Sequence, residues 1–137
     1  FMSSIYLNIT GTNAVCIHTG NLQVEGLHSI RLANINTSNS VSIDLYVSDN
    51  HPNVIDTLPN SANDWTPESD PTVNSYYILK TVVVPPAVSL ILNEDESNYD
   101  VLNYKLYIKL TGTSPTVDVI IHEKLSNIKK NKKITNY

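Results

Sequence analysis

Residues 41–47 read Val41-Ser42-Ile43-Asp44-Leu45-Tyr46-Val47, and this stretch decides the fold class. Its apolar residues alternate with polar or amphipathic ones. Successive side chains of a strand point to opposite faces, so this period of two predicts a strand with one buried and one wet face. Such strands are typical of antiparallel sheets, because strands buried on both faces read as unbroken apolar runs.

The same period extends outward along most of the chain. Turn-forming residues, including Gly20-Asn21 and Pro85-Pro86, separate the alternating segments. The eight candidate strands lie at residues 5–9, 15–17, 28–33, 41–47, 76–84, 88–92, 104–110 and 117–121. Short, regularly spaced strands predict an all-β fold, an antiparallel two-sheet β-sandwich of the jelly-roll or Ig-like kind.

The 137 residues are enough for one domain, which we expect to span residues 3–123. Residues 48–75 break the alternation, carry four prolines and form a predicted long loop. Its tryptophan, Trp65, either anchors a contact with a partner or caps an open end of the sandwich. Helix is almost absent from the pattern. Residues 123–134 could form a last helical turn or an arm that orders against a neighbour.

Charge is unevenly placed. All 13 acidic residues and four of the nine basic residues lie in residues 1–123, whereas residues 124–137 hold five lysines and no acid. The acidic body disfavours nucleic acid as a partner. The tail lysines could lie on an acidic neighbour or form a solvated terminus. The tail residues taken as candidate contacts are Lys129, Lys130, Lys132 and Lys133.

Residues with catalytic or metal-binding chemistry form no known motif. The four glycines form no phosphate-binding loop, and the single cysteine excludes an internal disulfide framework. Cys16 and His18, two apart on one strand, are expected to share a face, as a reactive pair or as a half-buried thiol beside a surface imidazole. The acidic loops around residues 49–56 and 94–100 could hold Ca²⁺ or be solvated turns. No apolar run reaches the roughly 18 residues of a membrane helix. We therefore expect no catalytic, cofactor, metal or membrane-binding role.

Tyrosine is the more suggestive residue type, with eight in the chain. Alternation places Tyr46 and Tyr107 on the wet faces of their strands, and Tyr6 is a further candidate. With Ile120 also facing outward, one sheet would carry an apolar outer patch. Such a patch is typical of a protein interface, although ordinary surface tyrosines and sugar stacking remain alternatives.

Five strings resemble, in kind and in order, small β-sandwich virion proteins of tailed phages, particularly those of marine cyanophage type. The resemblance covers roughly residues 24–122. The strings are LHSIRLAN (27–34), VSIDLYV (41–47), YYILK leading into VPPA (76–87), SLIL (89–92) and VDVII (117–121).

This resemblance implies a structural protein without a catalytic motif, located in the virion and assembled in the bacterial host cytoplasm. Its partners would be major capsid or tail and neck subunits, with capsid decoration favoured and a neck or tail position next. It would form a homo-oligomer such as a trimer. Two alternatives stay open: a carbohydrate-binding module, for example on a fibre, and a small enzyme that uses Cys16 and His18.

Overall fold

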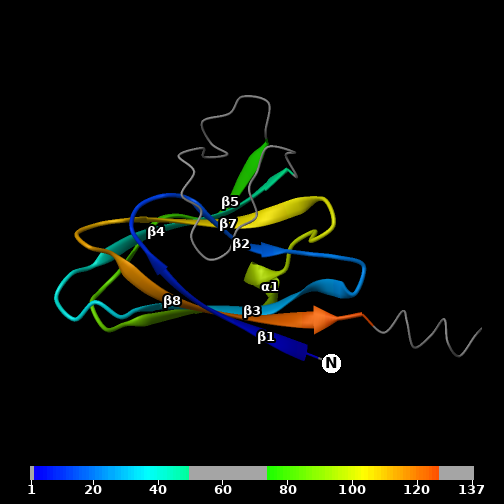
Figure 1. Ribbon diagram of the computed structural model, residues 1–137, viewed down its shortest axis with the longest axis horizontal. Helices are drawn as coiled ribbons and strands as arrows, with labels where there is room; N and C mark the ends of the chain where they lie inside the picture. The colour runs from blue at the N-terminus through cyan, green and yellow to red at the C-terminus, as the bar shows by residue number, and fades with distance from the viewer. Residues whose placement is uncertain (1, 50–73, 127–137) are drawn as a thin grey trace, which may run out of the picture.

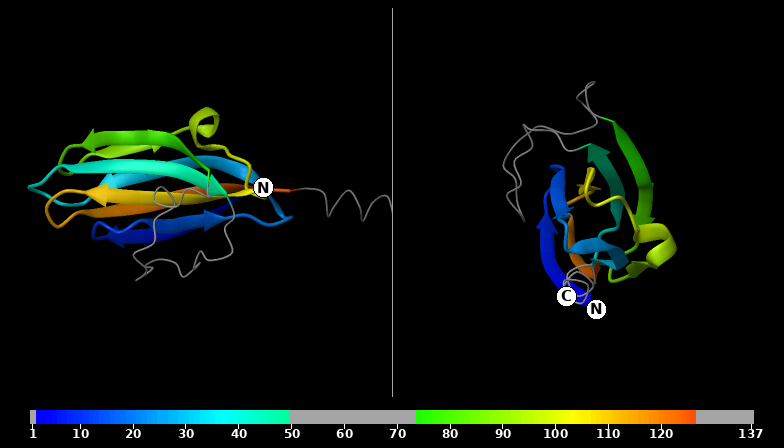
Figure 2. Two further views of the ribbon diagram at one scale, coloured as in Figure 1. Left: turned by 90° about the horizontal axis from the view of Figure 1, so that it is seen from above. Right: turned by 90° about the vertical axis from the view of Figure 1, so that its right-hand side faces the viewer.

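Two four-stranded antiparallel sheets pack face to face in the computed structural model, which describes residues 2–49 and 74–126 (Figure 1). The two layers are clearest in the side views of Figure 2. The predicted β-sandwich of eight strands is confirmed. The fold thus follows from alternation that each strand carries in its own sequence.

The first sheet, called sheet A, has the strand order β1-β8-β3-β6. Its strands are β1 (Met2–Thr10), β8 (Thr116–Leu125), β3 (Val24–Asn34) and β6 (Ser89–Leu92). The first and last strands of the described chain are neighbours, and their register runs without a shift from the Met2–Lys124 pair to the Thr10–Thr116 pair. The strand β8 continues through Leu125, two residues beyond the predicted domain boundary.

The second sheet, called sheet B, has the order β2-β7-β4-β5. Its strands are β2 (Val15–Thr19), β7 (Tyr104–Thr111), β4 (Val41–Asp49) and β5 (Ser75–Val84). A short helix, α1 (Glu94–Ser97), lies between β6 and β7 in the chain and contacts β3. The strands β4 and β5 include Ser48, Asp49 and Ser75, so both ends of the predicted 48–75 loop belong to strands. Residues 50–73 lie outside the described residues.

One core fills the space between the sheets, and every strand contributes to it. Burying a Leu, Ile or Val side chain stabilises the fold by about 1.5–3 kcal/mol. The fully or almost fully buried core residues are Ile9, Val15, Ile17, Leu27, Ile30, Leu32, Val41, Ile43, Leu45, Val84, Leu92, Leu106, Ile108, Leu110, Val117, Val119 and Ile121.

A buried asparagine fixes the turns at one end of the core. The Nδ2 atom of Asn34, at the end of β3, donates to the carbonyl oxygens of Asn39, Val84 and Pro85 at 3.0–3.1 Å. Its Oδ1 accepts from the backbone N–H of Asn36 at 3.0 Å. A single side chain thus connects the turn after β3 to the turn between β5 and β6.

Candidate functional site

A row of four side chains crosses the outer face of sheet B. The register places Cys16 opposite Tyr107, Tyr107 opposite Tyr46, and Tyr46 opposite Tyr77, one residue from each strand. The rings of Tyr46 and Tyr107 stack with centroids 5.6 Å apart and planes 12° apart. The rings of Tyr46 and Tyr77 lie 5.1 Å apart, and Lys80 Nζ lies 4.4 Å from the centre of the Tyr77 ring.

The prediction that Tyr46 and Tyr107 are solvent-exposed is wrong. Their exposed fractions are 0% and 3%, and with Cys16 they form a second buried cluster apart from the main core. Alternation assigns a residue to a face of the sheet, but it does not say whether that face is covered. These two tyrosines therefore stabilise the fold from the outer side of sheet B and offer no exposed ring to a partner.

The prediction that Cys16 and His18 share a face is also wrong, because β2 carries a bulge between them. Cys16 lies opposite Tyr107, whereas His18 lies opposite Leu106, whose side chain belongs to the core. An extra residue in one strand changes the facing of every side chain that follows it. Cys16 thus belongs to the outer cluster and His18 points between the sheets.

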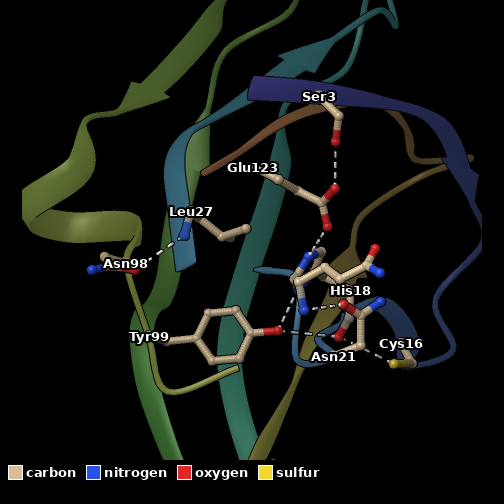
Figure 3. Close-up of polar contacts among 9 residues, drawn as sticks. Ser3, Cys16, His18, Asn21, Leu27, Asn98, Tyr99 and Glu123 are labelled. Atoms are coloured by element: carbon tan, nitrogen blue, oxygen red, sulfur yellow. Dashed lines mark hydrogen bonds and ion pairs between the residues drawn. The ribbon is translucent and has the colours of Figure 1, made fainter. Parts of the chain in front are cut away.

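His18 is the centre of a buried polar cluster that connects the two sheets (Figure 3). Its Nε2 lies 2.6 Å from Oε2 of Glu123 in β8. The hydroxyl of Ser3, in β1, donates to the other carboxylate oxygen at 2.6 Å. On the opposite side of the ring, Nδ1 lies 2.5 Å from the hydroxyl of Tyr99, in the segment that follows α1. Four segments distant in sequence thus meet in this cluster, three of them through direct contacts of the imidazole.

Burial sets the protonation of this cluster. The pKa of His18 is lowered from its ordinary value, because loss of solvent disfavours the imidazolium more than Glu123 favours it. Burial is also the main reason that the pKa of Tyr99 lies well above its ordinary value. A neutral His18 then donates its Nε2–H to Glu123 and accepts the hydroxyl proton of Tyr99 at Nδ1.

This arrangement shares its order of groups with a base-activated nucleophile, but its imidazole is enclosed between the sheets. In such a site the imidazole must contact the nucleophile and a third group orients the imidazole. Here Glu123 contacts one nitrogen of His18, and the hydroxyl on the other side of the ring is that of Tyr99, whose pKa burial raises well above its ordinary value. His18 is 1% exposed, so the ring is closed to solvent. Chemically, the cluster can stabilise the contact between the sheets and respond to pH.

Sequence reasoning missed Ser3, Tyr99 and Glu123 as partners of His18. Glu123 is 105 residues from His18 in the chain, and Tyr99 is 81 residues away. A charged residue at an inward-facing position of a strand was the one available signal. Glu123 has that position, because it follows Val119 and Ile121 with a period of two.

An exposed apolar surface lies on the outer face of sheet A. The register aligns Tyr6, Ile120, Arg31 and Ile91 across all four strands, and we call these four residues the outer row. Tyr6 is 65% exposed and Ile91 is 52% exposed, while Ile120 is partly buried. The prediction of one patch formed by Tyr46, Tyr107, Tyr6 and Ile120 is therefore wrong, because Tyr6 and Ile120 lie on sheet A whereas Tyr46 and Tyr107 are buried on sheet B.

A shallow depression of about 310 Å³ adjoins this row. It lies over β1 and β8 and is lined by Tyr6, Leu7, Asn8, Asp118, Val119 and Ile120. Asn8 donates to the Asp118 carboxylate at 2.7 Å on its floor. The depression thus combines an exposed aromatic ring with an amide and a carboxylate.

The acidic segment 94–100 makes contacts of its own. Glu94 forms a 2.8 Å ion pair with Lys124, and this contact is the largest cause of the lowered pKa of the Glu94 carboxyl. Asp100 accepts hydrogen bonds from Leu102 and Asn103. Within residues 2–49 and 74–126, no group of three or more His, Cys, Asp or Glu side chains is placed to hold a metal ion.

The remaining predicted contact residues lie outside the described residues. They are Trp65, Lys129, Lys130, Lys132 and Lys133. His51 and Asp56, which belong to the other acidic loop, also lie outside them. Among the helices of the described segments, none is long and apolar enough to cross a membrane. No protein-family model matches the sequence, and no curated protein matches it.

Proposed function

We propose that this chain is a non-enzymatic structural subunit of a tailed-phage particle that works by binding other capsid or tail proteins. Capsid decoration is the favoured position and a neck or tail position is the next. The observation that carries the proposal is the outer row of sheet A, in which Tyr6, Arg31 and Ile91 are exposed and Ile120 is partly buried. Aromatic residues and Arg are enriched at protein interfaces.

The resemblance to small β-sandwich virion proteins supports the proposal that this chain is part of a phage particle. Its strings fall on β3, β4, β5, β6 and β8, and the VPPA string forms the turn that Asn34 holds through Val84 and Pro85. The strings thus fall on five of the eight strands of one sandwich, and β7 lies between the last two of them.

The buried polar cluster supports a structural role in a second way. An enzyme needs its reactive groups to reach a substrate, and His18 is almost fully enclosed between the sheets. The Cys16 thiol is 3% exposed and belongs to a different cluster. The two residues that sequence alone offered as a reactive pair are therefore separated by the sheet itself.

The first test is sedimentation of the native source lysate on a density gradient, followed by peptide mass spectrometry of each fraction. Recovery in the dense, phage-sized fraction at many copies per particle is the expected result. Copies in the hundreds would indicate capsid decoration, and copies in the low tens or fewer would indicate a neck or tail part. Recovery in the soluble fraction alone would overturn the proposal.

A matched pair of variants tests the surface. Ile91→Glu places a charge in the outer row, whereas Leu102→Glu places one at an equally exposed apolar residue away from it, 51% exposed against 52%. We expect Ile91→Glu to abolish association with particles and Leu102→Glu to retain it, with both variants as thermally stable as the parent. Equal association of the two variants would exclude the outer row as the contact.

A carbohydrate-binding module is the second candidate, favoured by the depression beside Tyr6. An exposed aromatic ring can stack on a sugar while Asn8 and Asp118 hydrogen-bond its hydroxyls. A glycan array with the parent chain and Tyr6→Ala tests this candidate. Binding that Tyr6→Ala removes would favour it over the virion subunit, and an array without binding above background would reject it.

A further inference from the structure

The strand β1 is an edge of sheet A, and its own residues carry none of the usual protections against pairing. It has nine residues, Met2–Thr10, and none of them is charged, proline or glycine. Its register with β8 has no shift over its whole length, so the strand is regular. An edge that is long, regular and uncharged is a template for another strand.

The other three edges are each blunted. The edge strand β6 has four residues, and β2 has five residues with a bulge after Cys16. The strand β5 is long, but its register shifts twice, and Thr81 has a positive φ of 54°. Short strands, bulges and charges such as Lys80 are the devices by which edges avoid pairing. Within the described residues, β1 stands out as the edge without such a device.

We propose that β1 pairs antiparallel with β1 of a second copy of this chain, about a two-fold axis at Tyr6. The two copies of sheet A then form one continuous eight-stranded sheet. This inference goes beyond the proposed function and does not depend on it, because it rests on the strand alone.

A second copy fits this edge because β1 is self-complementary. Tyr6 is the middle residue of the strand, so a two-fold axis there places Tyr6 opposite Tyr6, Ile5 opposite Leu7 and Ser4 opposite Asn8. All of these pairs are uncharged, so no like charges meet. An interface with two-fold symmetry requires such a self-matching surface on both copies.

The contact also completes the core at this edge. Ile5 and Leu7 pack against the core but remain half-buried, as expected for inward-facing residues of an edge strand. A neighbouring strand would place Leu7 of one copy beside Ile5 of the other and bury both further. On the outer face, the two Tyr6 rings would meet beside the depression that each helps to line.

The test is the molecular mass of the purified full chain by light scattering and sedimentation, from about 1 μM to about 1 mM, a range that spans weak to moderate affinity. We expect a monomer–dimer equilibrium. Tyr6→Lys places two like charges opposite each other, and we expect it to weaken the dimer about tenfold or more. The control Val83→Lys makes the same change at a 61% exposed residue of the edge strand β5 and should leave the equilibrium unchanged.

A charge exchange makes the test specific for the two-fold axis. Tyr6→Lys and Tyr6→Glu should each dimerise more weakly than the parent chain, and their mixture should form a mixed dimer more readily than either variant forms its own dimer. A third variant, Tyr6→Cys, should form a disulfide-linked dimer under mild oxidation, because directly opposite residues of antiparallel strands lie within the Cα separation that a disulfide spans. Val83→Cys should not do so.

Three results would overturn the inference. They are a parent chain that stays monomeric at about 1 mM, a dimer that Val83→Lys weakens as much as Tyr6→Lys does, and a mixture of the Lys and Glu variants that stays monomeric. The virion proposal fails separately, because a chain absent from particles could still dimerise in purified form. Circular dichroism of each variant shows that the sandwich remains folded, as expected for changes at an exposed residue.

Discussion

The imidazole of His18 and the carboxylate of Glu123 meet at 2.6 Å between the two sheets, so β2 of sheet B is joined to β8 of sheet A through the core. A charged or polar pair in such a place is stabilising only while each group keeps its partner. Ser3 and Tyr99 supply the remaining hydrogen bonds.

Acidification should destabilise the fold through His18. Burial lowers the pKa of this residue in the folded chain below its ordinary value of 6.5, so the unfolded chain binds the proton more readily. The free energy of unfolding should therefore fall as the pH drops below about 6.5 and level off below the folded pKa. Urea titrations at several pH values, with NMR titration of the His18 ring, measure both quantities.

The matched control for this prediction is His28, whose side chain is half exposed. His18→Gln should remove much of the pH dependence between pH 6.5 and the folded pKa, and His28→Gln should retain it. A folded-state titration of His18 above pH 6.5 would contradict the prediction.

Removal of the Tyr99 hydroxyl should cost stability. Tyr99→Phe leaves Nδ1 of a buried His18 without its donor, and an unsatisfied buried group costs about 1–3 kcal/mol. Tyr6→Phe is the control, because the Tyr6 side chain is exposed and its loss of a hydroxyl should change the free energy of unfolding by less than about 0.5 kcal/mol. Chemical denaturation of both variants gives the comparison, and equal stabilities would exclude a structural hydrogen bond at Tyr99.

The stacked tyrosines of sheet B should behave as core residues. Tyr46→Ala should lower the free energy of unfolding by about 3–5 kcal/mol, as for other large buried aromatic residues. Tyr6→Ala should lower it by less than about 0.5 kcal/mol. Thermal and urea unfolding distinguish the two. A Tyr46 variant as stable as the Tyr6 variant would mean that the outer cluster contributes little.

The Asn34 side chain should be among the most important polar groups for stability. Asn34→Ala removes the amide that three carbonyl groups share and the oxygen that accepts from the Asn36 N–H, with an expected cost of about 2–4 kcal/mol. The Pro85 carbonyl keeps its second partner, the Val88 N–H. Asn8→Ala removes one exposed hydrogen bond and should cost far less. Hydrogen exchange of the amides around residues 36–40 and 84–88 should accelerate in the Asn34 variant alone.

The sequence predicted the strands well because each strand carries its own alternation, as at residues 41–47. The prediction was wrong where the direction of a side chain depends on features that the alternation does not contain. A single extra residue in β2 reverses the facing of His18 relative to Cys16, and period counting cannot detect such a bulge. The prediction for Tyr46 was wrong for another reason. The alternation placed Tyr46 on the correct face of its strand, but that face is buried at this residue. The pairing of β1 with β8 and the His18–Glu123 contact depend on long-range topology, which alternation does not encode.

The pairing of β1 with β8 has a mechanical consequence. Met2 and Lys124 are register partners, so the start of β1 and the end of β8 lie side by side at one end of sheet A. A pulling force applied between these two points would load the hydrogen-bonded pairs one after another and peel β1 away at low force. The same force applied between Thr10 and Lys124, at opposite ends of the strand pair, would load all nine pairs at once in shear. The resistance of this sandwich to tension therefore depends on where along β1 it is held.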